Sequence, residues 1–163
     1  MLVASRTAGG YGSRGPRMID SMLVATDGSE TAAKAVSEAA DLAAGTGARV
    51  HVMTAYQPLR AKVSSGRTVA PEAADWHLAQ DSQADSILDA ACATLRLRGV
   101  EAEPHARKGD PADAIIDLAE ELGADLIVVG NKGLTGARRF LLGSVPDKVS
   151  HHAPCSVLIV YTT

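Results

Sequence analysis

Short runs of apolar residues alternate along the chain with longer segments in which apolar residues recur every three or four positions. The short runs predict five strands, over residues 22–26, 49–56, 100–107, 125–130 and 156–161. The first, fourth and fifth runs are almost wholly apolar, which is typical of strands covered by helices on both faces. The third contains Pro104, which cannot donate a hydrogen bond to a neighbouring strand, so we expect this strand at an edge of the sheet.

The longer segments carry the start and stop signals of helices, over residues 29–47, 70–99, 109–123 and 143–153. Asp27 and Ser29 can each cap the first helix, because their side-chain oxygens accept hydrogen bonds from its free amides. The third has Asp110 at the cap position, Pro111 at the first helical position and Gly123 after its end. The chain is therefore expected to alternate between strands and helices throughout.

This alternation indicates an α/β fold, in which parallel strands are joined by right-handed helical crossovers. We expect a doubly wound sheet with helices on both faces. Ligands bind such sheets beyond the carboxyl ends of the strands, where the strand order reverses. The apolar character of strands one and four makes them central neighbours, which puts the crevice between residues 26–30 and 130–133, TDGSE and GNKG.

Length and composition predict a single domain. The chain has 163 residues, of which 46% are hydrophobic and 21% charged, and this suits one folded unit. Residues 1–17 are rich in Gly, Ser and Arg and lack the apolar core of a signal peptide, so we expect a disordered tail there and one domain over residues 18–163. No apolar run approaches the roughly 20 residues of a membrane-spanning helix.

Charge, cysteine and histidine content narrow the expected partners. A net charge of −3 gives no basic face for nucleic acid or for an anionic membrane, so we expect neither partner. Cys92 and Cys155 lack metal-binding spacing and predict a reducing, cytoplasmic location. His51 has no Cys, Asp or Glu at ligand spacing in its strand, and His151 and His152 suit the end of the last helix, so no metal site is predicted.

Glycines follow the fourth predicted strand at a spacing that can hold a phosphate. The loop runs Gly130-x2-Gly133-x9-Gly143-Ser144, and its last two residues begin a helix whose free amides and dipole attract anions. The alternative is that the glycines only form turns or permit close packing. The phosphate motifs GxxxxGK[ST] and GxGxxG are absent.

The loop after the first predicted strand complements the glycine loop. Its sequence, TDGSE, carries Asp27 and Glu30, which would repel a polyphosphate but can accept hydrogen bonds from a ribose hydroxyl or a base amino group. Asp27 can equally be a helix N-cap, and both roles can hold at once. A phosphate cradle beside an acceptor for sugar or base predicts a nucleotide.

The motif G-x2-G-x9-G-S after VVG, with ATDGSE near the start and CSVLIV near the end, closely resembles the universal stress protein family. The resemblance implies a Rossmann-like, adenine nucleotide α-hydrolase-like fold, with a five-stranded parallel sheet in the order 3-2-1-4-5. It also implies a homodimer that binds ATP or cyclic AMP, with Mg²⁺ as a companion of ATP. The loop is similar to that of actinobacterial members that favour cyclic AMP. Carried over by position, the nucleotide-binding residues would be Ala25, Thr26, Asp27, Ala55, Val129, Gly130, Asn131, Lys132, Gly133, Gly143, Ser144 and Val145.

Three functions stay open, of which we favour the first. It is a regulatory protein of the stress response that binds an adenine nucleotide and has no catalytic residue. The second is an enzyme that hydrolyses ATP or transfers a nucleotidyl group, although related folds with that activity have a Ser- and Gly-rich loop where this chain has TDGSE. The third is a dimeric interaction module with incidental nucleotide binding, because the strand over residues 156–161 would be an apolar edge unless it paired with its copy.

Overall fold

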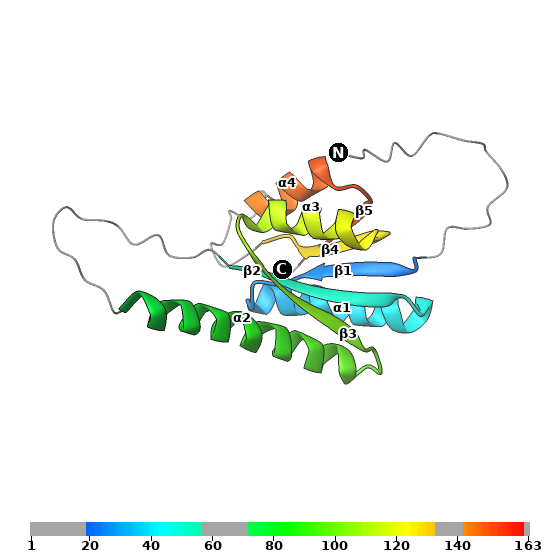
Figure 1. The fold of residues 1–163 in the computed structure, drawn as a ribbon. Helices are drawn as coiled ribbons and strands as arrows, with labels where there is room; N and C mark the ends of the chain where they lie inside the picture. Colours follow the sequence, from blue (N-terminus) through cyan, green and yellow to red (C-terminus); the bar gives the residue numbers. More distant parts are fainter. Residues whose placement is uncertain (1–18, 57–71, 133–141, 162–163) are drawn as a thin grey trace.

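The computed structural model describes residues 19–56, 72–132 and 142–161, with the side chains of residues 72–81 left out. Strands and helices alternate along these residues (Figure 1). In chain order the elements are β1 (Ser21–Ala25), α1 (Glu30–Thr46), β2 (Arg49–Tyr56), α2 (Glu72–Arg96), β3 (Ala102–Lys108), α3 (Pro111–Leu122), β4 (Leu126–Gly130), α4 (Ser144–His152) and β5 (Ser156–Val160). The strict alternation predicted from the hydrophobic pattern is confirmed.

The five strands form one parallel sheet in the order β3-β2-β1-β4-β5, as predicted. Helices α1 and α2 lie on one face of the sheet, and α3 and α4 lie on the other (Figure 1). The order reverses at β1, since the chain adds β2 and β3 on one side of it and then β4 and β5 on the other. Pro104 lies on β3, which is an edge strand as predicted. Proline has no backbone N–H, and an edge strand tolerates this because no strand pairs with its outer side.

Two hydrophobic cores lie on the two faces of the sheet, because successive side chains of a strand point to opposite faces. Met22 and Val24 of β1 pack with α1 and α2, and both are fully buried. Leu23 of β1 packs on the opposite side with Met53 of β2 and Ile127 of β4, at 0–1% exposure. This double coverage explains why β1 and β4 are apolar without alternation.

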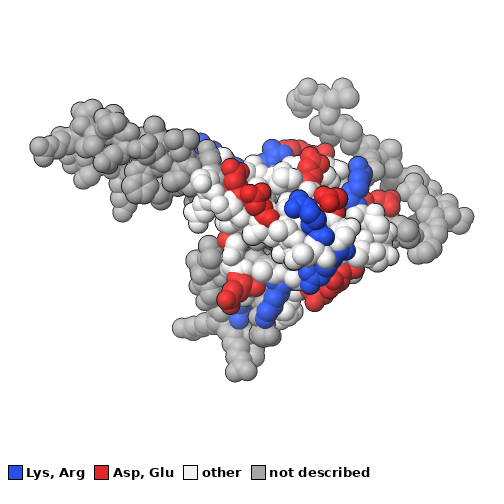
Figure 2. All heavy atoms as spheres, turned by 90° about the horizontal axis from the view of Figure 1, so that it is seen from below, with Lys and Arg blue, Asp and Glu red and all other residues white. Residues whose placement is uncertain are grey.

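Charged side chains cover the outside of the helices. On the face that carries α1 and α2, acidic and basic side chains stand next to one another (Figure 2). Arg98, just beyond α2, donates to Asp41 of α1 at 2.9 Å between Nε and Oδ1. None of the helices in the described part of the chain has the length and apolarity needed to cross a membrane.

The first helix, α1, is capped by one of the two residues that the sequence allowed and not by the other. Ser29 is the N-cap of α1, and its Oγ accepts a hydrogen bond from the Ala32 amide at 3.1 Å. Asp27 does not cap the helix; its Oδ1 accepts instead from the amide of Ser29 at 3.0 Å and from the Ser29 hydroxyl at 2.6 Å. The cap interpretation of Asp27 was therefore wrong, because the residue two positions later takes the cap and Asp27 holds it in place.

Gly28 lies between these two residues in a conformation that favours glycine. Its φ of +78° belongs to the left-handed region, and a Cβ built there would lie 2.9 Å from Cγ1 of Ile87 on α2. The loop after β1 therefore turns directly beneath α2, and this turn directs Asp27 and Ser29 to the carboxyl end of the sheet.

We predict that Gly28→Ala lowers the free energy of unfolding by about 1–3 kcal/mol. A non-glycine residue in the left-handed region costs about 1–2 kcal/mol, and the overlap with Ile87 adds to it. Gly45→Ala is the matched control, because Gly45 lies within α1 with no atom within 4 Å of its added Cβ. That change should stabilise by about 0.5–1 kcal/mol. Urea denaturation measures both, and equal stability of the two variants would contradict the prediction.

Candidate functional site

The loops after β1 and β4 meet at the carboxyl end of the sheet. Ser29 Oγ lies 2.9 Å from Thr31 Oγ1 in the first turn of α1. The Thr31 hydroxyl donates in turn to the carbonyl oxygen of Lys132, just beyond β4, at 3.3 Å. Polar contacts therefore connect Asp27, through the Ser29 and Thr31 hydroxyls, to the loop that the sequence predicts to hold phosphate; because each hydroxyl has one proton, the two outer hydrogen bonds leave the Ser29–Thr31 pair as a close contact only.

Thr26, directly after β1, is hydrogen-bonded to β2 and to the loop that follows. Its amide donates to the Met53 carbonyl at 2.9 Å, which extends the pairing of β1 with β2 by one residue. Its Oγ1 accepts from the Gly28 amide at 3.2 Å. Only 8% of Thr26 is exposed, so it fixes the loop from within.

Asn131 joins the end of β4 to the start of α4. Its backbone amide donates to the Val160 carbonyl of β5, and its backbone carbonyl accepts from the Gly143 amide, both at 2.9 Å. A Cβ on Gly143 would lie 3.4 Å from that same carbonyl oxygen, which is an ordinary van der Waals contact. The hydrogen bond between Gly143 and Asn131 brings the start of α4 against the end of β4, and the packing role of Gly143, considered from sequence as an alternative to phosphate binding, stays a prediction. Gly133 lies outside the described residues.

The amino terminus of α4 lies at this junction and has no side-chain cap. Its N-cap, Gly143, makes no side-chain cap hydrogen bond, and Pro146 in the first turn carries no N–H. The amides of the exposed Ser144 and of Val145 thus lie at the positive end of the helix dipole without a side-chain cap. Such a helix start attracts an anion.

Lys148 holds α4 against α3. Its Nζ lies 2.7 Å from Oδ1 of Asp113 and 3.3 Å from Oδ1 of Asp110. The amides of Asp113 and Ala112 also donate to Asp110, the N-cap of α3. The hydrogen bond from the Asp113 amide, aided by Lys148, keeps the pKa of the Asp110 carboxyl below its ordinary value. The charged carboxylate therefore caps α3 and pairs with Lys148 of α4.

Small apolar residues predicted to contact the nucleotide belong to one cluster. Val129 is 3% exposed in the core between the sheet and α3, and the half-buried Ala25, Ala55 and Val145 pack against that core. They come from β1, β2, β4 and α4. The structure thus brings together the predicted residues of four different elements, while Gly130 continues β4 and places Asn131 at its end.

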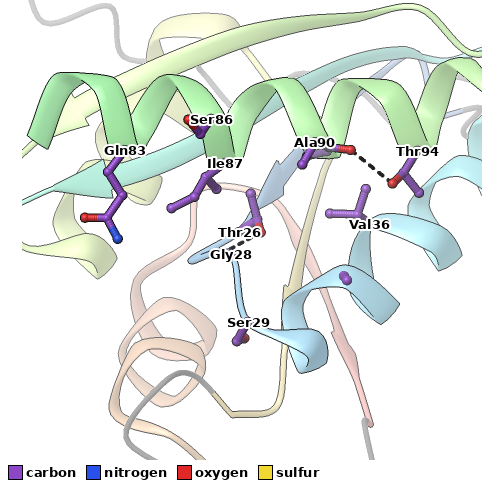
Figure 3. A pocket seen from close by; sticks show the side chains of 11 residues that line it. Thr26, Gly28, Ser29, Val36, Gln83, Ser86, Ile87, Ala90 and Thr94 are labelled. Carbon is purple, nitrogen blue, oxygen red and sulfur yellow. Dashed lines mark hydrogen bonds between the residues drawn. The ribbon is translucent and has the colours of Figure 1, made fainter. Parts of the chain in front are cut away.

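A separate hollow of about 320 Å³ lies between α1 and α2 (Figure 3). It shares Thr26 with the predicted site, and sequence reasoning missed it. The Ser86 and Thr94 hydroxyls on its wall donate to carbonyls of their own helix, those of Ser82 and Ala90, at 2.9 and 3.1 Å. The lining residues are Thr26, Gly28, Ser29, Ala33, Val36, Gln83, Ser86, Ile87, Ala90, Ala91 and Thr94.

The structure places ligand-type side chains of the neighbouring strand beside His51, which has none at ligand spacing in its own strand. His51 of β2 stands in register with Glu103 of β3, and His105 follows on the same side. The ring nitrogens His51 Nδ1 and His105 Nε2 are 3.1 Å apart, across 54 residues of sequence. Burial lowers the pKa of His105, with the carboxylate of Glu103 acting against it. Spacing within one strand could not show this cluster, because it forms across two strands.

Comparison with known proteins gives consistent matches over nearly the whole chain. A family model described as the universal stress protein family matches residues 18–161. Universal stress protein YxiE of Bacillus subtilis is 36% identical over 147 residues, covering 88% of this chain and 99% of that protein. A universal stress protein solved in complex with cAMP is 32% identical, with a TM-score of 0.70, covering 90% of this chain and all of that one. A universal stress protein from Archaeoglobus fulgidus in complex with dAMP is 28% identical, with a TM-score of 0.63, covering 88% and 98%.

Proposed function

The chain belongs to the universal stress protein family, and from this premise we propose that it binds an adenine nucleotide at the carboxyl ends of β1 and β4. The observation that carries the proposal is the junction of the two loops through the Thr31–Lys132 hydrogen bond and of β4 with α4 through Asn131 and Gly143. The nucleotide acts as a regulatory ligand, and the proposal includes no chemical step. Relatives solved with cAMP and dAMP support the choice of adenine.

The base and ribose lie on the β1 and β2 side in this proposal. The half-buried Ala25 and Ala55, packed against a core that contains Val129, offer a small, apolar surface to the flat base. Asp27 is ordered by its hydrogen bonds from Ser29, and a carboxylate can accept several hydrogen bonds at once. It can therefore also accept from a ribose hydroxyl or from the base amino group.

The phosphate lies at the start of α4. The amides of Ser144 and Val145 and the helix dipole supply partial positive charge there, and Lys132 contributes a full charge from the neighbouring loop. Gly130, Asn131 and, by sequence position, Gly133 complete the proposed cradle. The acidic loop after β1 disfavours a long polyphosphate, so we place cyclic AMP before ATP, and ATP would carry Mg²⁺ to offset its charge.

The proposed active form is a homodimer that pairs through β5. This strand pairs with β4 on one side, and its residues Val157–Val160 are only half-buried. An apolar strand at a sheet edge offers its backbone groups to a second strand, and natural proteins cover such edges. A second copy of β5 related by a two-fold axis would cover this one.

Ser144→Glu is predicted to separate binding from stability. Its carboxylate would occupy the phosphate position and lower nucleotide affinity by about tenfold or more through like-charge repulsion. The free protein should be unchanged or stabilised by about 0.3–1 kcal/mol, because an acid in the first turn of a helix complements its dipole. Ser150→Glu, which adds the same charge at an exposed position later in α4, is the control and should bind as wild type.

Calorimetric titration with cyclic AMP and with ATP, beside a thermal melt, measures both effects of Ser144→Glu. ATP should lose more affinity than cyclic AMP, because it carries more negative charge. Wild-type affinity for both nucleotides in a folded Ser144→Glu protein would show that phosphate binds elsewhere.

Asp27→Ala is predicted to weaken nucleotide binding about tenfold, or about 1.4 kcal/mol, by removing an acceptor for the base or ribose. Ser29→Ala provides the comparison for stability, since it removes the cap of α1 and should cost about 1 kcal/mol of unfolding free energy. Titration and denaturation of both variants distinguish the roles. If Asp27→Ala lost as much stability as Ser29→Ala and kept the nucleotide affinity of the wild type, Asp27 would only stabilise the loop after β1 and would not contact the nucleotide.

Sedimentation velocity tests the proposed dimer. Between about 1 and 100 μM the protein should sediment as a dimer, because strand pairing across β5 buries an apolar edge. A monomer throughout this range would contradict the pairing without affecting the nucleotide proposal.

A further inference from the structure

A second polar cluster lies on the α3 face of the sheet edge, apart from the nucleotide crevice. It consists of His51 on β2 with Glu103 and His105 on β3. The parallel register aligns His51 with Glu103 and Met53 with His105, so the three side chains project from the same face. Met53 itself is buried in the core beneath α3 and α4, which identifies that face.

The potential ligand atoms lie close to the spacing of a transition-metal site, with a different oxygen of Glu103 near each histidine. His51 Nδ1 lies 3.1 Å from His105 Nε2 and 3.4 Å from Glu103 Oε2, and His105 Nε2 lies 3.9 Å from Glu103 Oε1. Two ligands bound to zinc at about 2.0–2.1 Å in a tetrahedron are about 3.3–3.4 Å apart. One ion can therefore contact all three side chains after small rotations, without movement of the strands.

The surroundings suit a fixed site that is open on one side. The side chains of His51 and His105 are only 10% and 15% exposed, whereas 66% of the Glu103 side chain is exposed. The imidazoles are thus held by the packed sheet, and the carboxylate faces solvent at the edge strand. Arg107, the next residue on the same face of β3, is engaged in an ion pair with Glu121 of α3.

We propose that His51, Glu103 and His105 bind one divalent transition-metal ion with the preferences of Zn²⁺. Two imidazoles and one carboxylate form a ligand set that favours zinc over Mg²⁺ or Ca²⁺, which prefer oxygen ligands. The fourth position of the tetrahedron is open to water at the solvent side. The bound ion links the edge strand β3 to β2, so metal binding stabilises the pairing of these two strands. This site does not depend on the proposed nucleotide function.

The alternative is that the two histidines only form a hydrogen bond with one another. The 3.1 Å contact between their ring nitrogens can be a hydrogen bond, in which one imidazole donates and the other accepts. A hydrogen-bonded pair of this kind needs no ion and would show no selectivity among metals. The two arrangements therefore give opposite results in a metal titration.

The test titrates Zn²⁺ into tag-free, chelator-treated protein without nucleotide, by calorimetry and by thermal melting. We expect one Zn²⁺ per chain with a dissociation constant in the micromolar range or below, and a higher melting temperature with metal. Co²⁺ as a spectroscopic probe should give the intense visible absorption bands of a four-coordinate site. Mg²⁺ at the same concentrations should neither bind stoichiometrically nor raise the melting temperature.

Two variants identify the ligands. Glu103→Gln keeps the shape of an exposed side chain and should lower Zn²⁺ affinity by roughly tenfold or more, and His105→Gln should lower it further. His151→Gln is the control, because the exposed His151 on α4 lies outside the cluster and should leave zinc binding unchanged. The melting temperature of Glu103→Gln without metal should equal that of the wild type.

Two results would overturn the proposal. One is the absence of stoichiometric zinc binding by the wild type. The other is zinc binding that survives in a folded Glu103→Gln or His105→Gln protein but is lost in His151→Gln, which would place the ion on α4.

Discussion

The parallel pairing of β1 with β2 on one side and β4 on the other is the constraint on which this molecule depends. Because β1 is hydrogen-bonded along both edges and covered on both faces, its residues are buried, and its carboxyl end is fixed relative to that of β4. The strand order reverses there, so the helices that follow the two strands leave on opposite faces. The loops that follow the two strands meet there, and the Thr31–Lys132 hydrogen bond joins them.

The same sheet register also determines the second polar cluster. The nucleotide site is proposed beyond the carboxyl ends of the central strands. The histidine cluster lies instead on β2 and the edge strand β3, on the face of the sheet that α3 covers. The histidine cluster consists of side chains that are distant in sequence and that β2 and β3 hold at fixed separations. Rigid elements of this kind place ligand groups without a cost in loop ordering when the ligand binds.

Local signals predicted most of the fold. The unbroken apolar runs of β1 and β4 indicated central strands, Pro104 indicated an edge, and Asp110 and Gly123 marked the ends of α3. Each of these effects depends on neighbouring residues or on burial alone. The choice between Asp27 and Ser29 as the cap was not decided by residue type, since both can accept from a helix amide; the turn at Gly28 decides it.

Features that arise between distant elements were not visible in the sequence. The His51–His105 contact needs the register of β2 and β3, and the hollow beside Ile87 needs the packing of α2 on α1. The family motif supplied the nucleotide residues, and the structure gathers Ala25, Ala55, Val129 and Val145 into one cluster. Their contact with a nucleotide stays a prediction, because it depends on a ligand and on a loop beyond the described residues.

Amide hydrogen exchange with and without saturating cyclic AMP or ATP tests most directly where the nucleotide binds. The account predicts slower exchange at the amides of Gly28 and Ser29, of Asn131 and Lys132, and of Ser144 and Val145, because contacts with the ligand protect them. Protection that is confined instead to the α2 residues Gln83, Ser86 and Ile87, on the wall of the hollow between α1 and α2, would contradict it.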